Sequence, residues 1–576
     1  MPSERSQILA NSRVGGALAG LIACAVVGVA PLSARAEMDV AGSLIVFNDN
    51  GAWSWFEDER AIVDVAAGKI LVSSVANAAG TGGVARNGDV EVVSYDIATG
   101  QVSPPFTLHD NLQADDHNSA AMWLRPDGKY LAMYAKHGSD QLSRYRISTT
   151  AGDPTQWGAE QTFNNGAGTT YSNLHYLPDD RGGAGRLYNF TRTSNFNPNI
   201  LTSNDLGATW SIGGRLVTQG TGNQRPYVRY FSDGEKIHFI TTEQHPRNFD
   251  NSVYHGYVQN GQLFNSTGSL LDSVLFDSSA VAPAALTTVF DSGASFGGET
   301  MTHGWTIDVS VDDAGRPLAI FQARVNGSTA DHRFFYARFD GSTWNVNQLA
   351  KAGGFLYGSE PDYTGLVALD PSDPDRLFIS SKIDPRDDVT MPHYEIFEGV
   401  TADGGASWQW SPITYNSTVD NLRPVVPKWD ADHTALLWMR GKYSTFVSYN
   451  LDVVGLVDIE PLAVLEAGDL NRDGSVDLAD FQMYIGGLHA SLGGLSFDDA
   501  YRQGDLNGDL ANNYQDFVMF KAAYDAANGP GAFAAALQIP EPATWAMMSL
   551  GGLAALAIRT GRLSDQSKRA SIAGVD

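Results

Sequence analysis

The sequence has one cysteine in 576 residues, Cys24, and this scarcity excludes several mechanisms. Cys24 lies inside an apolar N-terminal run that we expect to be removed on export. The mature chain then has no disulfide, no thiolate nucleophile and no cysteine-ligated metal. Basic residues are also few, with 38 lysines and arginines against 65 aspartates and glutamates, a formal charge of -27. This balance argues against a nucleic-acid partner, and it means that an acidic substrate must be met by a local cluster of arginine and histidine.

The N-terminus has the parts of an export signal. Positive charge precedes an apolar run from Val14 to Ala30, and a small-x-small cleavage site ends at Ala36. We therefore predict that residues 1–36 are a signal peptide and that the mature protein begins at Glu37. A lipoprotein carrying its lipid on Cys24 is the alternative that the sequence Leu-Ile-Ala-Cys leaves open.

Helical periodicity is almost absent between residues 37 and 460. Short alternating strands are separated there by turns of Gly, Asp, Asn and Pro, as in VRYFSDGEKIHFI and IDVSVDDAGRPLAIF. A hairpin series of this length exceeds what a β-sandwich needs and is typical of a β-propeller. We predict an all-β propeller of seven blades at roughly 50 residues or slightly more per blade, with six and eight as alternatives.

Two short repeats support the propeller. SNDLGATW at residues 203–210 and TADGGASW at residues 401–408 both fit the pattern of the Asp-box, or BNR repeat. In this turn the Asp carboxylate accepts from backbone amides, Gly adopts a backbone angle that other residues avoid, and Trp packs between blades. The motif is structural and leaves the activity of the propeller open.

Two histidines bracket one of the hairpins. Its turn, residues 125–129, reads Arg-Pro-Asp-Gly-Lys, which fits a three-residue hairpin loop with Gly at the left-handed position. In the register that pairs Arg125 with Lys129, His117 stands opposite His137. The two side chains are then expected on one face, starting about 5 Å apart. Each could simply cap a strand end, but paired imidazoles can also divide their roles, one neutral and one charged.

At this point the sequence resembles a known family. WSWFEDERAIVD, the paired histidines, TTYSNLHYL, RLYNFTRT, QRPYVRY and HPRNFDNSVYHGY occur in the order seen in BNR-4 type propellers, which include the ulvan lyases, a group of polysaccharide lyases. The resemblance covers most of residues 45–450. It implies an exported β-propeller that acts on an acidic polysaccharide.

The resemblance also implies site residues. His117 and His137 match the two active-site histidines of the lyases. Tyr171 matches the catalytic tyrosine, and Arg192 matches the arginine that meets the uronate carboxylate, with Arg186 as its rival. Further substrate contacts are expected at Tyr227, Arg225, His245 and His255. The last two histidines could equally be structural or bind a metal.

The implied residue types suit β-elimination. A uronate joined through O4 has a weakly acidic proton at C5, so its carboxylate must be neutralised before that proton can leave. Arginine does this with two parallel hydrogen bonds, and a charged histidine can help. We expect Tyr171 and His117 to handle the protons, and Arg192 and His137 to hold the carboxylate. The scheme requires no cofactor.

Two other functions remain open at this stage. A sialidase-type glycoside hydrolase would need an arginine triad, an early F-R-I-P-like segment and a Glu-assisted Tyr nucleophile, and the sequence has no such segment. A non-catalytic glycan-binding surface propeller would keep the Asp-boxes without needing the histidine, tyrosine and arginine set.

After Glu460 the pattern changes to calcium loops. Residues 469–480 place oxygen-bearing side chains at positions 1, 3, 5, 9 and 12 and Gly at position 6, and residues 505–516 repeat this with Leu510 in place of Gly. The expected Ca²⁺ ligands are Asp469, Asn471, Asp473, Ser475, Asp477 and Asp480, and then Asp505, Asn507, Asp509, Asn513 and Asp516. Two such loops with short helices resemble a type I dockerin over residues 466–530, which implies a cohesin-like partner.

The C-terminal segment resembles a PEP-CTERM sorting signal of Gram-negative bacteria. Pro540-Glu541-Pro542 precedes an apolar run from Ala543 to Ile558, and arginines follow. We assign residues 538–562 to this signal, read by its sorting machinery, and residues 563–576 to a tail. A plain anchor is the alternative, although the run is short for a membrane span. The protein is expected at the cell surface or outside the cell.

Overall fold

The computed structural model describes residues 38–39, 44–220, 222–277, 279–457, 468–471, 475–490, 492, 497–506 and 511–537. The predicted signal peptide, the sorting segment and the tail lie outside the described residues, as do Asp473, Asn507 and Asp509 of the calcium loops. Within the described ranges, no helix is both long and apolar enough to cross a membrane.

Seven antiparallel sheets make up the body of the chain. Blade 1 contains β3 (Ala61–Asp64), β4 (Lys69–Val75), β5 (Val90–Asp96), β6 (Gln101–Val102) and β7 (Phe106–His109). Blade 2 contains β8 (Ala121–Leu124), β9 (Tyr130–Ala135), β10 (Leu142–Ile147) and β11 (Gln161–Asn164). Blade 3 contains β12 (Leu174–Leu177), β13 (Arg186–Arg192), β14 (Pro198–Ser203) and β15 (Ser211–Arg215).

Blade 4 contains β16 (Val228–Ser232), β17 (Ile237–Thr242), β18 (Val253–Gln259), β19 (Gln262–Asn265), β20 (Leu270–Asp272) and β21 (Thr287–Phe290). Blade 5 contains β22 (Ser295–Phe296), β23 (Glu299–Val311), β24 (Pro317–Val325), β25 (His332–Phe339) and β26 (Trp344–Gly353). Blade 6 contains β27 (Val367–Asp370), β28 (Asp373–Ile383), β29 (Thr390–Val400) and β30 (Gln409–Pro412). Blade 7 contains β32 (Asp420–Val425), β33 (Ala435–Thr445), β34 (Ser448–Val457) and β2 (Ile45–Asn48).

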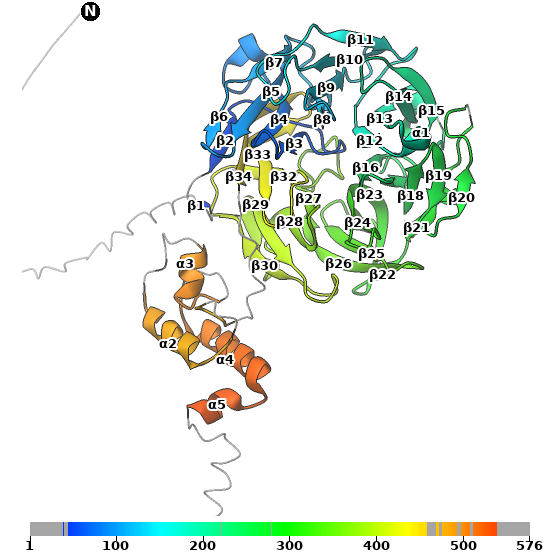
Figure 1. Cartoon of the computed structure of the whole chain (residues 1–576). Helices are drawn as coiled ribbons and strands as arrows, with labels where there is room; N and C mark the ends of the chain where they lie inside the picture. Colours follow the sequence, from blue (N-terminus) through cyan, green and yellow to red (C-terminus); the bar gives the residue numbers. More distant parts are fainter. Residues whose placement is uncertain are drawn as a thin grey trace, which may run out of the picture. The chain divides into compact units, whose positions relative to one another are not determined.

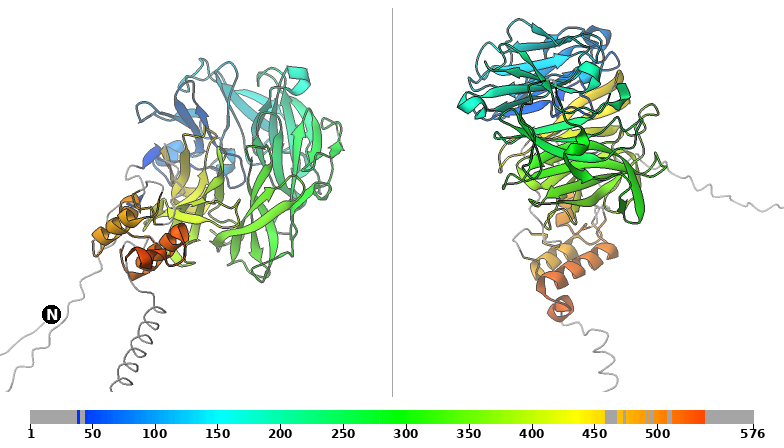
Figure 2. Two further views of the ribbon diagram at one scale, coloured as in Figure 1. Left: turned by 60° about the horizontal axis from the view of Figure 1, so that its bottom comes forward. Right: turned by 90° about the vertical axis from the view of Figure 1, so that its right-hand side faces the viewer.

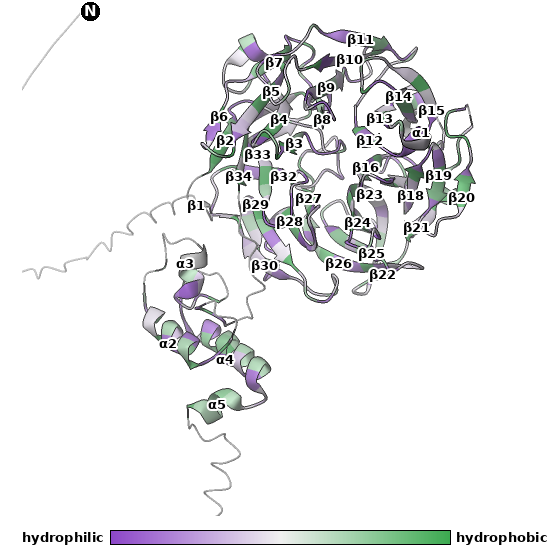
Figure 3. Cartoon of the chain, in the orientation of Figure 1, coloured by the Kyte–Doolittle hydropathy of each residue, from purple (hydrophilic) through white to green (hydrophobic). Residues whose placement is uncertain are grey.

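The blades form a closed ring, which confirms the prediction of a seven-bladed propeller (Figure 1). Strands β3, β8, β12, β16, β23, β27 and β32 lie nearest its centre. Two further views show the sheets side by side around the ring (Figure 2). Hydrophobic residues are spread around the whole ring, as packing between successive blades requires (Figure 3). A separate pair, β1 (Met38–Asp39) and β31 (Thr414–Tyr415), accompanies the blades.

The two ends of the propeller sequence meet in blade 7. Strand β2, from the start of the chain, pairs antiparallel with β34, from its end, with Ile45 opposite Gly455. The backbone hydrogen bonds between β2 and β34 therefore close the ring, because they join the start of the propeller sequence to its end within one sheet.

A segment between β2 and β3, with the sequence WSWFEDER at residues 53–60, is buried and links several blades. The Trp55 indole donates to the carbonyl of Thr364 at 2.6 Å. Ser119 donates to the carboxylate of Glu57 at 2.7 Å. These contacts join blade 1 to the segment before blade 6 and to the segment before blade 2. Buried charges need such partners, because an unpaired one is costly.

Both Asp-boxes form the predicted turn. Asp205 accepts from the backbone amide of Thr209 at 2.9 Å, and Asp403 accepts from that of Ser407 at 2.8 Å. Trp210, the last residue of the first box, is buried in the hydrophobic cluster between blades 2 and 3. The hydrogen bonds given for the two Asp carboxylates stay inside their own turns, as expected of a structural motif.

Short helices interrupt the propeller and form the small C-terminal region. The propeller has five single-turn 3₁₀ segments and one short turn of α-helix: η1 (Gly83–Arg86), η2 (Asp116–Asn118), η3 (Ser194–Phe196), η4 (Gly222–Gln224), η5 (Pro283–Ala285) and α1 (Asp180–Gly183). The C-terminal region has α2 (Leu478–Gly487), α3 (Phe497–Arg502), α4 (Tyr514–Asn528) and α5 (Ala532–Ala536). It has its own core, which includes Tyr484, Phe520 and Phe533.

Candidate active site

The predicted histidine pair forms. Strands β8 and β9 pair in the expected register, with Leu124 opposite Tyr130. His117 lies in η2 just before β8, and His137 lies just after β9. Their rings stack with centroids 3.9 Å apart and planes 15° apart. The turn therefore fixes the register, and the register brings together two residues that both lie beyond the strand ends.

One carboxylate bridges the two imidazoles. Asp115 Oδ1 lies 2.7 Å from His117 Nδ1, and Asp115 Oδ2 lies 2.9 Å from His137 Nδ1. The carboxylate also accepts from the backbone amide of His117 at 3.1 Å, which makes it the cap of η2. Since each Nδ1 faces the carboxylate, each Nδ1 carries a proton, and the two Nε2 atoms remain for other partners.

The environment separates the charges of the two rings. Burial alone would lower the pKa of His117, but Tyr171, Asp115 and Asp116 outweigh it and raise that pKa well above its ordinary value. Asp116 lies 2.8 Å from His117 Nδ1. Burial and the neighbouring charge of His117 lower the pKa of His137 to about 4. At neutral pH His117 is therefore an imidazolium and His137 is neutral.

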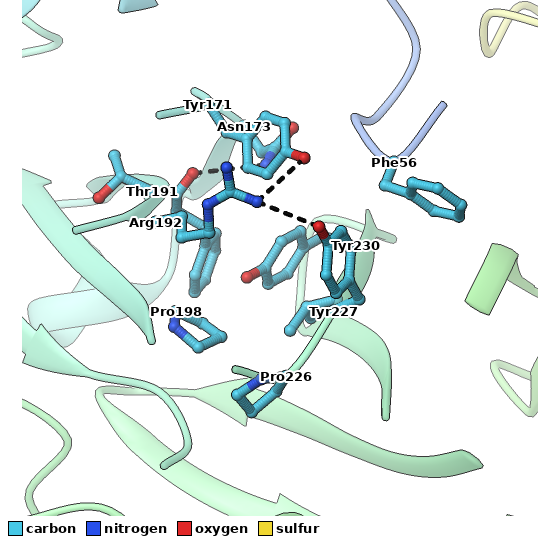
Figure 4. Close-up of a pocket in the computed structure, with 11 residues that line it drawn as sticks. Phe56, Tyr171, Asn173, Thr191, Arg192, Pro198, Pro226, Tyr227 and Tyr230 are labelled. Carbon is cyan, nitrogen blue, oxygen red and sulfur yellow. Dashed lines mark hydrogen bonds between the residues drawn. The ribbon is translucent and has the colours of Figure 1, made fainter. Parts of the chain in front are cut away.

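A buried arginine lies between two tyrosine hydroxyls. Arg192 Nη1 is 3.3 Å from the hydroxyl of Tyr171 and 3.3 Å from that of Tyr227 (Figure 4). Backbone hydrogen bonds of 2.9 and 2.8 Å between Thr170 and Arg192 hold Tyr171 and the arginine together. Tyr171 also has a φ of 69°, a left-handed conformation that is costly for a bulky residue and is often found at functional sites. The three side chains are at least nine-tenths buried.

Further basic groups surround Tyr227. Arg225 Nη2 lies 3.4 Å from its hydroxyl, and His245 Nε2 lies 3.3 Å from it. Arg247 forms an ion pair with the buried Glu360, which comes from the connection between blades 5 and 6. Together with Arg192, these side chains form the local basic cluster that an acidic substrate requires of an acidic protein.

The site repeats with the period of one blade. His117, Tyr171 and Tyr227 each precede the innermost strand of blades 2, 3 and 4, at intervals of 54 and 56 residues. Their partners stand at or just beyond the end of the second strand of the same blades: His137, Arg192 and His245. Three successive blades thus each contribute two side chains from the same end, which gathers them in one place.

The bridged histidine pair also has the composition of a metal site. Asp115, His117 and His137 offer a carboxylate oxygen and imidazole nitrogens within 4.8 Å of one another. The same atoms are hydrogen-bonded to each other, so a metal ion would have to displace the two Nδ1 protons.

The remaining predicted residues fall into clear groups. Arg192 reaches the site, whereas its rival Arg186 pairs with Asp180 and covers the ring of Phe276. His255 is not part of the site and is a correction to the expected substrate contact. It is fully buried in β18, with Nε2 against His238 at 3.2 Å and Nδ1 against Ser266 at 2.8 Å, so both ring nitrogens are occupied.

Asp115 and Asp116 contact the histidine pair and were not predicted from the sequence. They stand beside His117 in the sequence, and their spacing fits the cap of a short helical turn. Asp116 also accepts from the hydroxyl of Tyr443 at 2.7 Å. Phe446, at the tip of the β33–β34 hairpin, contacts both histidine rings edge-on. Blade 7 therefore packs against the histidine pair. This contact joins segments that are far apart in the sequence, so no local motif predicts it.

The two predicted calcium loops have buried acidic side chains at matching places among the described residues. Asp469 and Asp480 are buried in the first loop, and Asp505 and Asp516 are buried at the matching places in the second. Asp480 accepts from the backbone amides of Leu470, Asn471 and Asp477 at 2.8–3.0 Å. Buried carboxylates at these matching places suit a hard cation such as Ca²⁺, which prefers oxygen ligands.

Comparison with known proteins supports the architecture. Residues 83–352 match a family described as "BNR repeat-containing family member". No curated protein matches the chain. Among solved structures, an ulvan lyase of polysaccharide lyase family PL25, bound to -[GlcA(1-4)Rha3S]-, is 15% identical with a TM-score of 0.52, over 71% of this chain and 95% of that chain. The chain is thus a β-propeller with a BNR-repeat family match over residues 83–352, and it shares the fold of an ulvan lyase; at this identity the likeness shows the fold alone.

Two other solved structures are less similar. An α-L-arabinofuranosidase from Fusarium graminearum is 13% identical with a TM-score of 0.37, over 58% of this chain and 92% of that chain. The NanB sialidase from Streptococcus pneumoniae is 11% identical with a TM-score of 0.34, over 72% of this chain and 70% of that chain. At these TM-scores neither likeness bears on the function.

Proposed function

We propose that this protein is an exported polysaccharide lyase that cleaves a uronate-containing, ulvan-like glycan by β-elimination. The observation that carries the proposal is the buried guanidinium of Arg192 between the hydroxyls of Tyr171 and Tyr227. Because it stands in a pocket lined by aromatic side chains, it is suited to receive a carboxylate and has proton-transfer groups on both sides.

The substrate carboxylate is neutralised by two cations in this scheme. Arg192 supplies a permanent charge, and His117 supplies a second one, since its pKa stands well above its ordinary value. The sequence alone gave the neutralising role to His137. The burial of His137 beside a charged ring lowers its pKa, so the structure favours His117 for that role instead. Neutralising the carboxylate acidifies the C5 proton and lowers the barrier to its removal.

The elimination itself moves two protons. A base removes the proton at C5, the electron pair forms the C4–C5 double bond, and the C4–O4 bond breaks while an acid protonates O4. The two tyrosine hydroxyls beside Arg192 are the groups nearest the carboxylate position. The bound -[GlcA(1-4)Rha3S]- of the structurally similar ulvan lyase is a 1,4-linked uronate glycan, which agrees with this choice of substrate class.

The experiment is an assay of unsaturated product. The full chain is incubated with a panel of uronate glycans, including ulvan, and the ultraviolet absorbance of the new double bond is followed. Arg192→Lys keeps the charge but loses the two-pronged geometry, so binding and turnover should both fall. Arg186→Lys is the matched control on the same strand and should leave both unchanged. If no uronate polymer gives an unsaturated product while the folded protein binds glycans, the non-catalytic function replaces the lyase.

For the C-terminal region we propose a dockerin-like module that binds Ca²⁺ and docks a cohesin-like partner. In the first loop Asp469, Asn471, Ser475, Asp477 and Asp480 would hold the ion, together with Asp473. In the second, Asp505, Asn513 and Asp516 would do so, together with Asn507 and Asp509. The support is the burial of acidic groups at equivalent places of two repeats, since buried carboxylates need a compensating charge. When bound, the ion would supply that charge and tie each loop to the helix after it.

A further inference from the structure

The hydroxyl oxygen of Tyr227 has an unusual set of neighbours. Arg192 Nη1, His245 Nε2 and Arg225 Nη2 lie 3.3, 3.3 and 3.4 Å from it. The hydroxyl of Tyr171, on the other side of Arg192, has the guanidinium as its hydrogen-bond partner at 3.3 Å. Arg192 therefore contacts two tyrosine hydroxyls whose other neighbours differ.

The third neighbour of Tyr227 is a donor as well. The backbone amide of Arg247 points at His245 Nδ1, 3.4 Å away, so Nδ1 carries the lone pair. Burial and the charges of Arg225 and Arg247 lower the pKa of His245 to about 2, so the ring is neutral and its single proton is on Nε2. Nε2–H thus donates to Tyr227, as the two guanidinium groups do.

Three donors and no acceptor suit a phenolate better than a phenol. A neutral tyrosine hydroxyl can accept two hydrogen bonds and must place its own proton on a further acceptor when it is buried. Tyr227 is 6% exposed, and no carbonyl or carboxylate oxygen is hydrogen-bonded to its hydroxyl in the part of the chain that the structure describes. The ionised oxygen can accept all three bonds.

We propose that Tyr227 is a catalytic residue held as a phenolate, and that it is the base that removes the C5 proton. This inference rests on the proposed lyase function. The phenolate oxygen takes the proton from C5, the C5–H electron pair becomes the C4–C5 double bond, and the C4–O4 bond breaks. Tyr171 stays a phenol and gives its proton to the leaving O4. Proton transfer from Tyr227 to Tyr171 through solvent then restores the starting state.

The charges facing the two hydroxyls agree with this division. Burial raises the pKa of Tyr227, but Arg225 and Arg192 outweigh it and hold that pKa below its ordinary value, with His117 adding to the effect. Burial likewise raises the pKa of Tyr171, and there Arg192 and His117 only partly oppose it, so that pKa stays above its ordinary value. Tyr363, the other titratable side chain facing Tyr227, has a pKa well above its ordinary value and remains neutral. Environments that push the pKa values of two like groups apart are typical of an acid–base pair.

The first test is spectroscopic and needs no substrate. Near-ultraviolet difference spectra of the full chain are recorded from neutral to alkaline pH for wild type, Tyr227→Phe and Tyr171→Phe. Phenylalanine keeps the ring contacts of Tyr227 with Phe56 and Trp305, so the variant should fold. At neutral pH wild type should show one tyrosinate that Tyr227→Phe lacks and Tyr171→Phe retains. Arg225→Gln should move this tyrosinate to higher pH. Identical spectra for the two tyrosine variants would overturn the proposal.

The second test is kinetic. With a uronate substrate that wild type cleaves, Tyr227→Phe should lose about 10²–10⁴-fold in turnover with little change in KM, as expected for a lost proton-transfer group. Full activity of Tyr227→Phe would overturn the base role. A tyrosinate in the spectra without lyase activity on any uronate would overturn the lyase function, and the base role with it, while leaving the ionisation of Tyr227 established.

Discussion

The described part of the propeller contains two stacked histidine pairs, and they differ in charge. His117 and His137 stack at 3.9 Å around the carboxylate of Asp115. His238 and His255 stack at 5.4 Å in blade 4, with a direct nitrogen–nitrogen contact of 3.2 Å. The second pair is nearly unexposed, with a hydroxyl, that of Ser266, as the partner of His255.

The bridging carboxylate of Asp115 accounts for the difference in charge between the two pairs. Burial lowers the pKa of both His238 and His255, and the carboxylate of Asp233, 3.5 Å from His238 Nε2 but not bridging the two rings, only partly opposes it. These two rings are therefore neutral and act as packing and hydrogen-bonding groups. Burial acts in the same direction on His117, but Tyr171 and the two adjacent carboxylates of Asp115 and Asp116 together raise its pKa. A stacked pair of imidazoles is therefore not by itself a sign of catalysis, whereas a pair bridged by a buried carboxylate can hold a positive charge.

The largest effect is expected from the tyrosine beside the charged pair. Tyr171→Phe removes a hydroxyl from a ring that stacks on His117, so folding should survive. Turnover on a confirmed uronate substrate should fall by about 10²–10⁴-fold with little loss of substrate binding. Tyr257→Phe, beside His238 of the neutral pair, is the matched control and should keep full activity. Steady-state kinetics of both variants decide the matter, and an active Tyr171→Phe enzyme would contradict the assignment.

The next largest effect is expected from removing the charge of the Asp115 carboxylate. Asp115→Asn makes the charged pair resemble the neutral one, since an amide cannot accept from both Nδ1–H groups or compensate an imidazolium. Turnover should fall on the order of 10²–10³-fold, the range seen when a charge-stabilising group is removed from a site. The titration of His117, followed by NMR, should move to lower pH. Ser266→Ala beside the other pair should change neither quantity. An unchanged His117 titration in Asp115→Asn would show that Asp115 has no role in charging it.

The sequence predicted the pairing of His117 with His137 because a hairpin register is local. Once the turn at residues 125–129 is recognised, every opposite pair along two strands follows by counting. The blade number and the Asp-box turns were predictable for the same reason, since each depends on a repeating local pattern. Arg192 was preferred over Arg186 only through resemblance. Its place is fixed by backbone bonds to Thr170, across a long loop.

The rest of the site depends on contacts that are not local. His245 and His255 look alike in the sequence, but one lies beyond the end of β17 and the other lies inside β18, facing His238. The signal that separates them is the blade period: His245 is 53 residues after Arg192, as Arg192 is 55 residues after His137. Phe446 carries no such signal, because blade 7 reaches blade 2 only when the ring closes.

A smaller effect concerns stability in acid. The folded-state pKa values of His238 and His255 lie below the unfolded value of about 6.5. As pH falls below that value, the unfolded chain binds protons that the folded pair does not bind, so the free energy of unfolding falls. His255→Gln should weaken this dependence. The raised pKa of His117 acts in the opposite sense, giving stability that is present in acid and lost as pH rises through its folded value.

Urea unfolding between pH 5 and 8 measures this difference. Tyr257→Phe, which changes a ring beside His238 without removing a group that titrates in this range, is the control and should keep the wild-type pH dependence. If His255→Gln unfolds with the same pH dependence as wild type, the pair is not neutral in the folded protein.

The smallest effect on activity is expected from removing calcium. Chelation should lower the thermal stability of the C-terminal region, because its loops hold buried carboxylates that the ion would compensate. Calorimetry of the full chain should show this change in one transition, and Asp480→Ala should reproduce it more strongly than Asp516→Ala, since Leu510 replaces the glycine of the second loop. Asp525→Asn, an acid of α4 paired with Lys521, is the control outside the loops.

Lyase activity should be unchanged by the same treatment, because Asp115 bridges the two histidines through hydrogen bonds to Nδ1 and no metal ion is needed to hold them. Asp115, His117 and His137 are nevertheless close enough to bind one ion. If chelation abolished activity and added Zn²⁺ or Ca²⁺ restored it, while Asp480→Ala remained fully active, the ion would belong to the histidine pair. The difference between the two pairs would then lie in metal binding and not in a carboxylate-held proton.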